Sequence, residues 1–349
     1  MSTRIYVMTH TAFDPPQDPA YIPLHVGRAG KADLGYLGDD TGEHISDLNC
    51  YYGELTGLYW LWQNLNYEGN LGVCHYRRFF VDENRELLRE ADYDRILSEY
   101  DMITSKAMKL EVPYRDYYGE AHNARDLELE GEVIRALFPE DHAAFDQVMS
   151  GKKHYFGNLM VTSRKQFNAY CEWLFTIFAE LGARIDVSSY DAYHRRIFGF
   201  LSEQLLLVWV TARGLKVFES PFRITEEKAE TQELKLAVGQ LLKQKRIKEA
   251  RALFYEILKI RPDVRLEHSD LLGEIPLIEL ILYICECEQE RGIEGMLAYS
   301  LNLRDLTAHT KKVRAIQKKG ADIGQKEREY FRETKVSELM LEVLARNGE

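Results

Sequence analysis

The chain has 349 residues, of which 45% are hydrophobic, and a formal net charge of −11. This length and apolar content predict a globular protein with two domains of the usual size. The negative charge argues against a broad nucleic-acid surface, because neutralising a phosphate backbone requires a basic face. A pocket for one nucleotide-sized anion is compatible with this charge.

Cysteine usage and hydropathy predict a reduced, cytoplasmic protein. The five cysteines are an odd number and show neither a disulfide framework nor paired zinc-ligand spacing. The chain begins with a strand pattern and lacks the long apolar core of a secretion signal. Its longest apolar run, residues 275–285, contains Pro276 and Glu279 and is too short to span a bilayer.

Strand-like and helix-like patterns alternate over residues 1–225, which predicts an α/β domain with a mainly parallel sheet. The first strand is expected at Ile5–Met8. Residues 47–65 have the pattern of one helix with an inward stripe at three- and four-residue spacing. Gly53 and Gly57 lie one turn apart on another face, where they permit either tight packing or room for a ligand.

Three further strands are expected at residues 100–105, 155–162 and 215–221. Between the last two, Ser163 and Gln166 have the spacing of a capping box at the start of a long helix. Core packing explains the apolar stripe of that helix, which consists of Phe167, Tyr170, Leu174, Ile177, Phe178 and Leu181.

Beyond Arg223 every pattern is helical, so residues 226–349 are predicted to form a separate all-helical domain. Residues 233–245 and 247–260 give two helical patterns, and Pro262 stops the second. This hairpin resembles a single tetratricopeptide unit, without a convincing second copy.

Residues 71–80, Leu-Gly-Val-Cys-His-Tyr-Arg-Arg-Phe-Phe, run from a buried-strand pattern into an imidazole and two guanidiniums. Ligands of an open α/β sheet lie beyond the carboxyl ends of its strands, so His75, Arg77 and Arg78 are expected at a crevice. Two guanidiniums suit a diphosphate, because each offers a planar fork of donors and stays charged. The alternative is an arginine pair that bridges structural carboxylates.

The loop over residues 35–46 combines glycines, two adjacent acids and hydroxyls. Asp39, Asp40 and Thr41 can therefore surround a ribose or a sugar with short polar groups. The acidic pair can also contribute to a divalent cation site, although a metal needs more ligands than these two residues supply. A solvated turn is the alternative interpretation.

A helix capped by Ser202 would place Glu203 in its first turn, where the helix dipole favours the ionised carboxylate. A carboxylate held there beside a cleft can accept the proton of an attacking hydroxyl as a general base. The alternative is that glutamate simply favours helix starts.

Candidate acceptor contacts are spread over the middle of the chain. His122 and Asp126 are four residues apart on a predicted helix, so that both can point one way. His154 precedes a predicted strand that contains Asn158. With Asp191 these histidines and the asparagine form the candidate acceptor-binding set, and ordinary surface side chains are the alternative interpretation.

The chain contains no HExxH, GxSxG, P-loop or GxGxxG motif. This argues against a metalloprotease, a serine hydrolase, an NTPase and a dinucleotide-dependent oxidoreductase.

Four segments occur in the order Gly38-Asp-Asp-Thr-Gly42, Tyr51-Tyr-Gly-Glu-Leu-Thr-Gly-Leu-Tyr-Trp60, Gly72-Val-Cys-His-Tyr-Arg-Arg-Phe79 and Phe198-Gly-Phe-Leu-Ser-Glu203. In this order and spacing they closely resemble a bacterial family of capsule and exopolysaccharide glycosyltransferases, long catalogued as a domain of unknown function. Some members are assigned as galactofuranosyltransferases. The likeness covers about residues 3–223 and leaves the helical tail outside.

The resemblance implies a GT-A-like nucleotide-sugar fold and sugar transfer onto a growing, often lipid-linked glycan. The usual GT-A enzyme has an Asp-x-Asp metal motif after a central strand, where this chain has His75-Tyr-Arg-Arg78. Cationic side chains can stabilise a departing diphosphate much as a metal does. The need for Mg²⁺ or Mn²⁺ therefore stays open, and no covalently bound cofactor is expected.

On this resemblance the expected donor is a nucleotide sugar, with UDP-galactofuranose and UDP-galactose as candidates. Thr9 and the 38–42 loop would hold the nucleoside and sugar, and Arg77 and Arg78 with His75 would take the diphosphate. Glu203 would deprotonate the acceptor hydroxyl, so that direct displacement inverts the anomeric carbon.

Two other functions compete with this one. The first is a non-catalytic protein that binds a carbohydrate or a partner through its helical tail. The second is a sugar-phosphate nucleotidyltransferase, whose glycine-rich phosphate loop and lysine signature are not visible in the chain.

The basic stretch 311–319 can also rest against anionic lipid at the inner face of the plasma membrane, with a solvated helix as the alternative.

Overall fold

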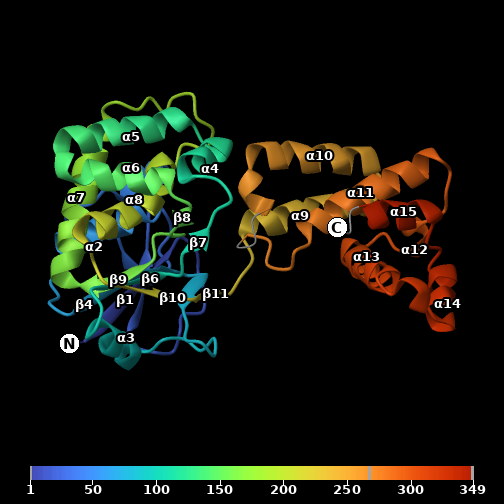
Figure 1. Ribbon diagram of the computed structural model, residues 1–349, viewed down its shortest axis with the longest axis horizontal. Coiled ribbons are helices and arrows are strands. Elements are labelled where there is room, and N and C mark those ends of the chain that lie inside the picture. Colours follow the sequence, from blue (N-terminus) through green and yellow to red (C-terminus); the bar gives the residue numbers. More distant parts are fainter. Residues whose placement is uncertain (1, 266–268, 347–349) are drawn as a thin grey trace. The chain divides into compact units, whose positions relative to one another are not determined.

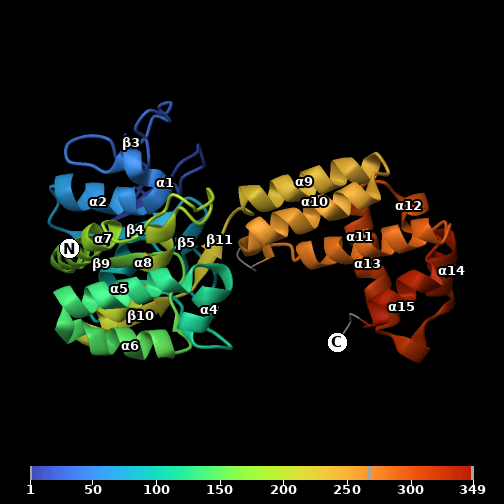
Figure 2. The ribbon, with the colours of Figure 1, turned by 90° about the horizontal axis from the view of Figure 1, so that it is seen from above.

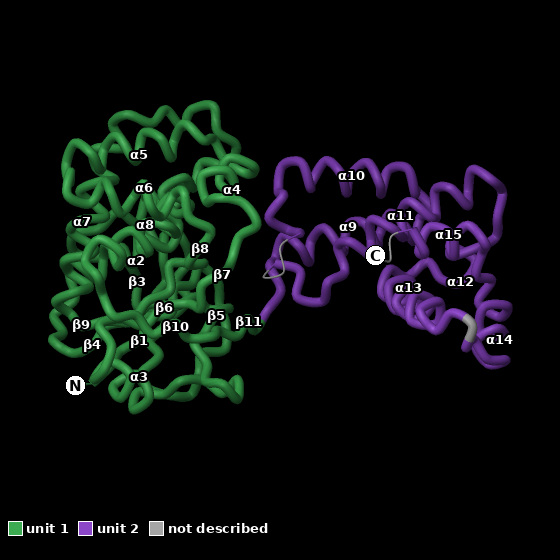
Figure 3. Tube along the Cα trace, viewed as in Figure 1, with its two compact units in different colours: residues 1–225 green, residues 226–349 purple. Residues whose placement is uncertain are grey.

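The structure is a computed structural model that describes residues 2–265 and 269–346. The chain forms two compact units, residues 1–225 (unit 1) and 226–349 (unit 2), which Figure 3 shows in separate colours. Every strand within the described residues belongs to unit 1.

Unit 1 is built on a sheet whose strands follow the order β10-β6-β9-β4-β1-β2-β3. All neighbouring strands in this order run parallel, except that β9 is antiparallel to β4 and β6. Figure 2 shows β3 and β10 at opposite edges of the unit. The strands of the order are β1 Thr3–Thr9, β2 Tyr21–His25, β3 Leu37–Gly38, β4 Asn70–His75, β6 Met102–Ser105, β9 Met160–Ser163 and β10 Val217–Ser220.

Four short strands complete unit 1. β5 Arg78–Phe80 pairs antiparallel with both β4 and β11 Phe222–Ile224. β7 Met108–Lys109 and β8 Lys153–His154 form a separate two-stranded sheet.

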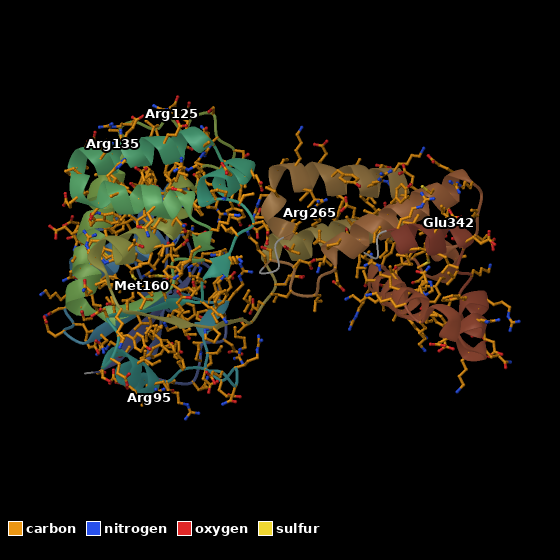
Figure 4. The ribbon with its side chains drawn as sticks, in the orientation of Figure 1. Arg95, Arg125, Arg135, Met160, Arg265 and Glu342 are labelled. Atoms are coloured by element: carbon orange, nitrogen blue, oxygen red, sulfur yellow. The ribbon has the colours of Figure 1, made fainter. Side chains whose placement is uncertain are left out.

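Helices cover both faces of the sheet (Figure 1). α3 lies on one face, and α2, α7 and α8 lie on the other, with α5 and α6 packed outside them. In Figure 4, Met160 lies at the level of the sheet, whereas Arg125 and Arg135 lie on the outer side of α5. The helices are α1 Asn49–Tyr52, α2 Leu55–Asn64, α3 Glu90–Leu97, α4 Tyr114–Ala121, α5 Ala124–Leu137, α6 His142–Ser150, α7 Arg164–Gly182 and α8 Ile197–Arg213, with 3-10 turns at Ser46–Leu48 and Pro139–Asp141.

The prediction of a mainly parallel α/β unit is confirmed. The helix expected after Ser163 is α7, and the Ser163 side chain accepts a hydrogen bond from the backbone N–H of Gln166 at its start. Its apolar stripe is buried throughout. Residues 155–159 of the strand expected over 155–162 are not in a strand, since β9 begins only at Met160.

The prediction of one helix over residues 47–65 is wrong, because the chain breaks at Gly53. This glycine has φ 56° and ψ −134°, a conformation that side-chain-bearing residues rarely adopt. α1 ends before it, and Glu54 then caps α2. Gly57 provides tight packing, since a Cβ there would lie 2.6 Å from Met8 Sδ and 2.7 Å from Val26 Cγ1.

The predicted start of the helix that contains Glu203 is also wrong. α8 begins at Ile197, because apolar residues on both sides of Gly199 are buried and extend the helix. Ser202 is therefore no cap, and its hydroxyl donates to the Gly199 carbonyl within the helix. Glu203 lies in the second turn, where the dipole argument does not apply.

His122 and Asp126 do not share a helix. α4 ends at Ala121, and Asn123 caps the next helix, α5, by accepting a hydrogen bond from the Arg125 N–H. The turn between them changes the direction of the chain, so helical spacing does not relate the two side chains.

Unit 2 consists of helices with a core of their own. Its first two helices begin and end close to the predicted residues and pack as a hairpin. No helix among the described residues is long and apolar enough to cross a membrane. The helices are α9 Ala229–Lys243, α10 Ile247–Ile260, α11 Ile275–Glu290, α12 Met296–Tyr299, α13 Leu303–Gln317, α14 Gln325–Glu333 and α15 Glu338–Arg346, with 3-10 turns at Pro262–Arg265 and Gly320–Asp322.

The basic stretch 311–319 falls mainly on α13 and is partly occupied by contacts inside unit 2. The Lys312 ammonium lies 3.5 Å from the centre of the Tyr330 ring, and Lys319 pairs with Glu327 at 2.6 Å. Its contact with anionic lipid stays a prediction.

Candidate functional site

Polar residues gather where the parallel strands of unit 1 end. Met8 is in register with His75 of β4, Thr9 with His25 of β2, and His25 with Gly38 of β3. Because parallel strands share one carboxyl edge, these residues lie along the same edge of the sheet.

The β4–β5 hairpin explains how His75 and Arg78 come together. The two residues are paired across the hairpin, and Tyr76 and Arg77 form its two-residue turn. Directly opposed residues of an antiparallel pair point to the same face, so the imidazole and the guanidinium are neighbours. The adjacent arginines thus differ in place, with Arg77 in the turn and Arg78 on a strand.

Arg78 packs against an aromatic ring, and a glycine leaves space for its guanidinium. Its Cζ lies 4.4 Å from the centre of the Phe156 ring, a cation–π distance. A Cβ on Gly157 would lie 3.1 Å from Arg78 Nη1, and Gly157 has φ 86°. The glycine therefore serves both the close approach of the guanidinium and the left-handed turn before β9.

Two carboxylates lie near this arginine. Glu54 Oε1 is 3.8 Å from His75 Nε2, and Glu203 Oε2 is 3.7 Å from His154 Nε2. The side chains of Glu54 and Glu203 are 21% and 22% exposed, so water reaches both. Both carboxylates favour the charged form of Arg78, and the cluster therefore combines a cation with two acids.

Asn158 ties three elements of this cluster together. Its Nδ2 donates to Glu54 Oε1 at 2.8 Å and to Ser202 Oγ at 2.8 Å, and it lies 3.4 Å from the Gly199 carbonyl oxygen. The residue is 7% exposed and has φ 53°, which is uncommon for a residue other than glycine. The amide of Asn158 joins Glu54 to α8, and its predicted contact with an acceptor stays a prediction.

His154 is likewise committed inside the cluster. Gln204 Nε2 donates to the Lys153 carbonyl, which turns Gln204 Oε1 toward His154 Nδ1 at 2.8 Å. The imidazole proton therefore lies on Nδ1, and Nε2 faces Glu203. His154 is buried, and burial lowers the pKa of its imidazole. It therefore contributes to the cluster as a neutral supporting side chain.

Burial sets the charges of the cluster. It lowers the pKa of His75 to about 4, with the positive charges of Arg78, Arg77 and His10 adding to the effect and Glu54 opposing it. Burial, together with the charge of Arg77, lowers the pKa of Arg78 to about 10. At neutral pH the imidazole is therefore neutral and the guanidinium is charged.

The glycine-rich loop over residues 35–46 is held by hydrogen bonds to a buried carboxylate. Asp39 is fully buried, and its carboxylate accepts hydrogen bonds from Gly27 N at 2.8 Å, Arg28 N at 3.1 Å and Ser46 Oγ at 2.5 Å. These contacts brace the loop, and the donor contact expected for Asp39 stays a prediction. Asp40 Oδ1 lies 3.5 Å from Arg28 Nη1.

Thr41 and Thr9 also make local bonds. Trp60 Nε1 donates to the carbonyl and hydroxyl oxygens of Thr41 at 2.8 Å and 3.1 Å. The Thr9 hydroxyl donates to the Thr11 carbonyl at 2.6 Å. Thr41 is exposed and Thr9 is buried, so only the first presents a side chain to solvent.

These residues do not fit a divalent cation. Asp39 already accepts from three N–H and O–H donors, and Asp40 lies beside the positive charge of Arg28. Over residues 2–265 and 269–346, no three His, Cys, Asp or Glu side chains are arranged to hold a metal ion.

The predicted site residues thus divide into three places. His75, Arg78, His154, Asn158 and Glu203 belong to the cluster beside Phe156, with Arg77 in the turn next to it. Asp39, Asp40 and Thr41 belong to the loop after β3, with Thr9 at the end of β1. His122 and Asp191 line a separate pocket among α4, α5 and α8.

Sequence reasoning missed Glu54. It lies in the Tyr51–Trp60 segment, but an unbroken helix would place it as one ordinary surface glutamate among others. A signal was present in Gly53, because a glycine directly before an acid can end one helix and start another.

The lowered pKa of His75 predicts a specific loss of stability in mild acid. Its contribution is fully present above pH 6.5, the ordinary histidine value, and is lost as pH falls toward 4, because only the unfolded chain takes up the proton. The wild-type free energy of unfolding of unit 1 should fall more steeply than that of His75→Gln, by up to about 1.4 kcal/mol per pH unit.

Urea unfolding of both proteins at several pH values between 4.5 and 7.5 measures this difference. His154 and His25 are present in both proteins, so their effects cancel in the comparison. Equal pH dependence in the two proteins would contradict a neutral, half-buried His75.

One solved structure is similar to this chain. The apo structure of the WbbM bifunctional glycosyltransferase is similar to this chain, with 28% sequence identity and a TM-score of 0.61 over 65% of this chain and 46% of that chain. The match therefore spans less than half of that protein's length. Comparison with curated proteins gave no match.

The likeness and the mainly parallel sheet establish a GT-A-like α/β fold followed by a helical region. The sequence model of one protein family, described as Domain of unknown function (DUF4422), matches residues 4–214, more than half of the chain. The chain belongs to this family.

Proposed function

We propose that the chain is a glycosyltransferase that moves a sugar from a nucleotide-sugar donor, UDP-linked in our proposal, to a hydroxyl of a growing bacterial surface glycan. The similar solved structure is that of a glycosyltransferase, and 28% identity relates the two chains. The observation that carries the proposal is Arg78, a charged guanidinium at the carboxyl edge of the sheet with the partly exposed carboxylates of Glu54 and Glu203 near it.

In this proposal Arg78 and Arg77 neutralise the diphosphate of the donor. Arg78 is charged at neutral pH, and its partial removal from water strengthens its attraction for an anion. His75 is neutral, and its Nε2 is buried without a hydrogen-bond partner. This nitrogen can therefore donate to or accept from a donor oxygen without adding charge.

Glu203 serves as the base. The acceptor oxygen attacks the anomeric carbon while the bond from that carbon to the diphosphate oxygen breaks, and the nucleoside diphosphate leaves with the bonding electrons. The hydroxyl proton passes to the Glu203 carboxylate, and the anomeric carbon inverts. Glu54 is less suited to this step, because one oxygen of its carboxylate already accepts a hydrogen bond from the Asn158 amide.

The loop after β3 is proposed to hold the nucleoside and sugar. Thr41 offers an exposed hydroxyl, and Asp39 gives the loop its shape by binding two backbone amides. No step of this proposal passes through a metal ion.

Screening a panel of nucleotide sugars tests the function directly. One donor should raise the thermal unfolding temperature of the full chain and release its nucleoside diphosphate, with and without EDTA. Consumption of a nucleoside triphosphate with a sugar phosphate would show a nucleotidyltransferase instead. Glycan binding without any nucleotide release would show a binding protein.

Glu203→Gln should lower the rate of sugar transfer by about 10²- to 10⁴-fold, the usual contribution of a general base. The thermal shift caused by the donor should not change, because the base contacts the acceptor. Glu172→Gln replaces an exposed glutamate on α7 and should behave as wild type. Wild-type turnover of Glu203→Gln at saturating acceptor would exclude Glu203 as the base.

Arg78→Lys retains the positive charge but loses the planar fork that binds two oxygens at once. Donor affinity should fall about 10- to 100-fold, the loss of a charge-assisted hydrogen bond. Arg95→Lys, an exposed change on α3, is the matched control. Unchanged donor affinity in Arg78→Lys, measured by titration calorimetry, would remove Arg78 from the donor site.

A further inference from the structure

A small pocket lies between the end of α4, the start of α5, the loop 189–194 and the first turn of α8. The space inside it that water can occupy is about 140 Å³. One buried water needs about 10–15 Å³ of such space, so the pocket accommodates roughly ten to fourteen non-hydrogen atoms. One hexose ring with its hydroxyl groups has this size.

One wall of the pocket is aromatic. The centre of the His122 ring lies 4.3 Å from that of Phe200 and 4.8 Å from that of Tyr118, and all three rings line the pocket. Aromatic faces carry partial negative charge and attract the edges of groups with partial positive charge. The C–H groups on one face of a pyranose meet this description, because each lies beside an electronegative oxygen.

The other wall presents fixed polar groups. The Tyr190 hydroxyl accepts a hydrogen bond from Asn123 Nδ2 at 2.8 Å and donates to Asp126 Oδ2 at 2.7 Å. Asp126 is 3% exposed, so this hydroxyl is held in place from the protein side. Asp191 is held in turn by the backbone N–H groups of Tyr193 and His194 and by the His194 ring.

The pocket lies next to the proposed base. Phe200 lines it, and Glu203 follows three residues later on the same face of α8. α4 makes a second connection, because Tyr118 lines the pocket while the ring of Tyr114 lies 5.2 Å from that of His154, the neighbour of Glu203. A sugar in the pocket is therefore about one helical turn from the carboxylate.

We infer that this pocket binds one pyranose ring of the acceptor glycan and so presents a neighbouring hydroxyl to Glu203; the inference rests on the proposed glycosyltransferase function. Binding of a pyranose requires an aromatic face for the ring carbons, and preoriented hydrogen-bond acceptors and donors for the hydroxyls. The pocket supplies both within a volume that suits one sugar.

Saturation-transfer NMR on the full chain without donor tests the pocket. The probes are the methyl α- and β-pyranosides of glucose, galactose, mannose and N-acetylglucosamine. At least one should bind, and Tyr190→Phe should weaken its affinity about five- to tenfold, because one hydrogen bond is lost. Phe200→Leu, which retains apolar volume but removes the ring face, should weaken it as well.

Tyr67→Phe is the matched control, since it also removes one hydrogen-bonded tyrosine hydroxyl, but before the amino end of β4. It should bind the probe as wild type does. The inference is overturned if no methyl pyranoside binds, or if both pocket variants bind as tightly as the control.

The result separates this inference from the proposed function. Donor hydrolysis in the absence of acceptor depends on Arg78, so it should fall in Arg78→Lys and be the same in Tyr67→Phe and wild type. A chain that hydrolyses a nucleotide sugar but binds no pyranoside would retain the function and lose the pocket. A chain that binds a pyranoside through Tyr190 but never releases nucleotide would retain the pocket as a carbohydrate site and lose the enzyme.

Discussion

The polar cluster of unit 1 depends on one guanidinium, that of Arg78, which is kept charged while it is partly removed from water. Desolvation of a cation costs several kcal/mol unless nearby groups compensate for the lost hydration. Glu54 and Glu203 supply negative charge near Arg78, and the face of Phe156 supplies a π-system. An anionic ligand at this place would face a cation that is already poorly hydrated, so less water has to be removed when it binds.

Three backbone positions with positive φ bring the members of this cluster together. Gly53 ends α1 and allows Glu54 to lead α2, while Gly157 and Asn158 form a left-handed turn before β9. Such conformations cost of order 1–3 kcal/mol for a non-glycine residue and persist where the surroundings hold them. At Asn158 the hydrogen bonds to Glu54 and Ser202 are those surroundings. The contacts that hold Asn158 in this conformation therefore also position the Glu54 carboxylate and α8.

The sequence and the structure agree best where local pattern and packing demand the same thing. The α7 stripe follows from helical spacing, and the end of α10 at Ile260 follows from Pro262 two residues later. The sequence and the structure disagree at polar residues whose hydrogen-bond partners lie far away in the sequence. Ser202 looked like a helix cap, but buried apolar residues before it extend α8 by more than a turn. The spacing of residues did not indicate that the Asp39 carboxylate binds the amides of the Gly27–Arg28 turn.

What the sequence determined by itself is the alternation of elements, the start of the helical region near residue 226, and the placement of His75 and Arg78 at a strand end. These follow from periodicity and from turn residues, which act over a few positions along the chain. Only the tertiary structure decided that Glu54 and Glu203, 149 residues apart in number, both lie near Arg78. It also placed Phe200 and Tyr190 around one pocket with Asn123 and Asp126. Contacts of this kind depend on how strands and helices pack across the sheet, and the spacing of residues along the chain carries no record of that packing.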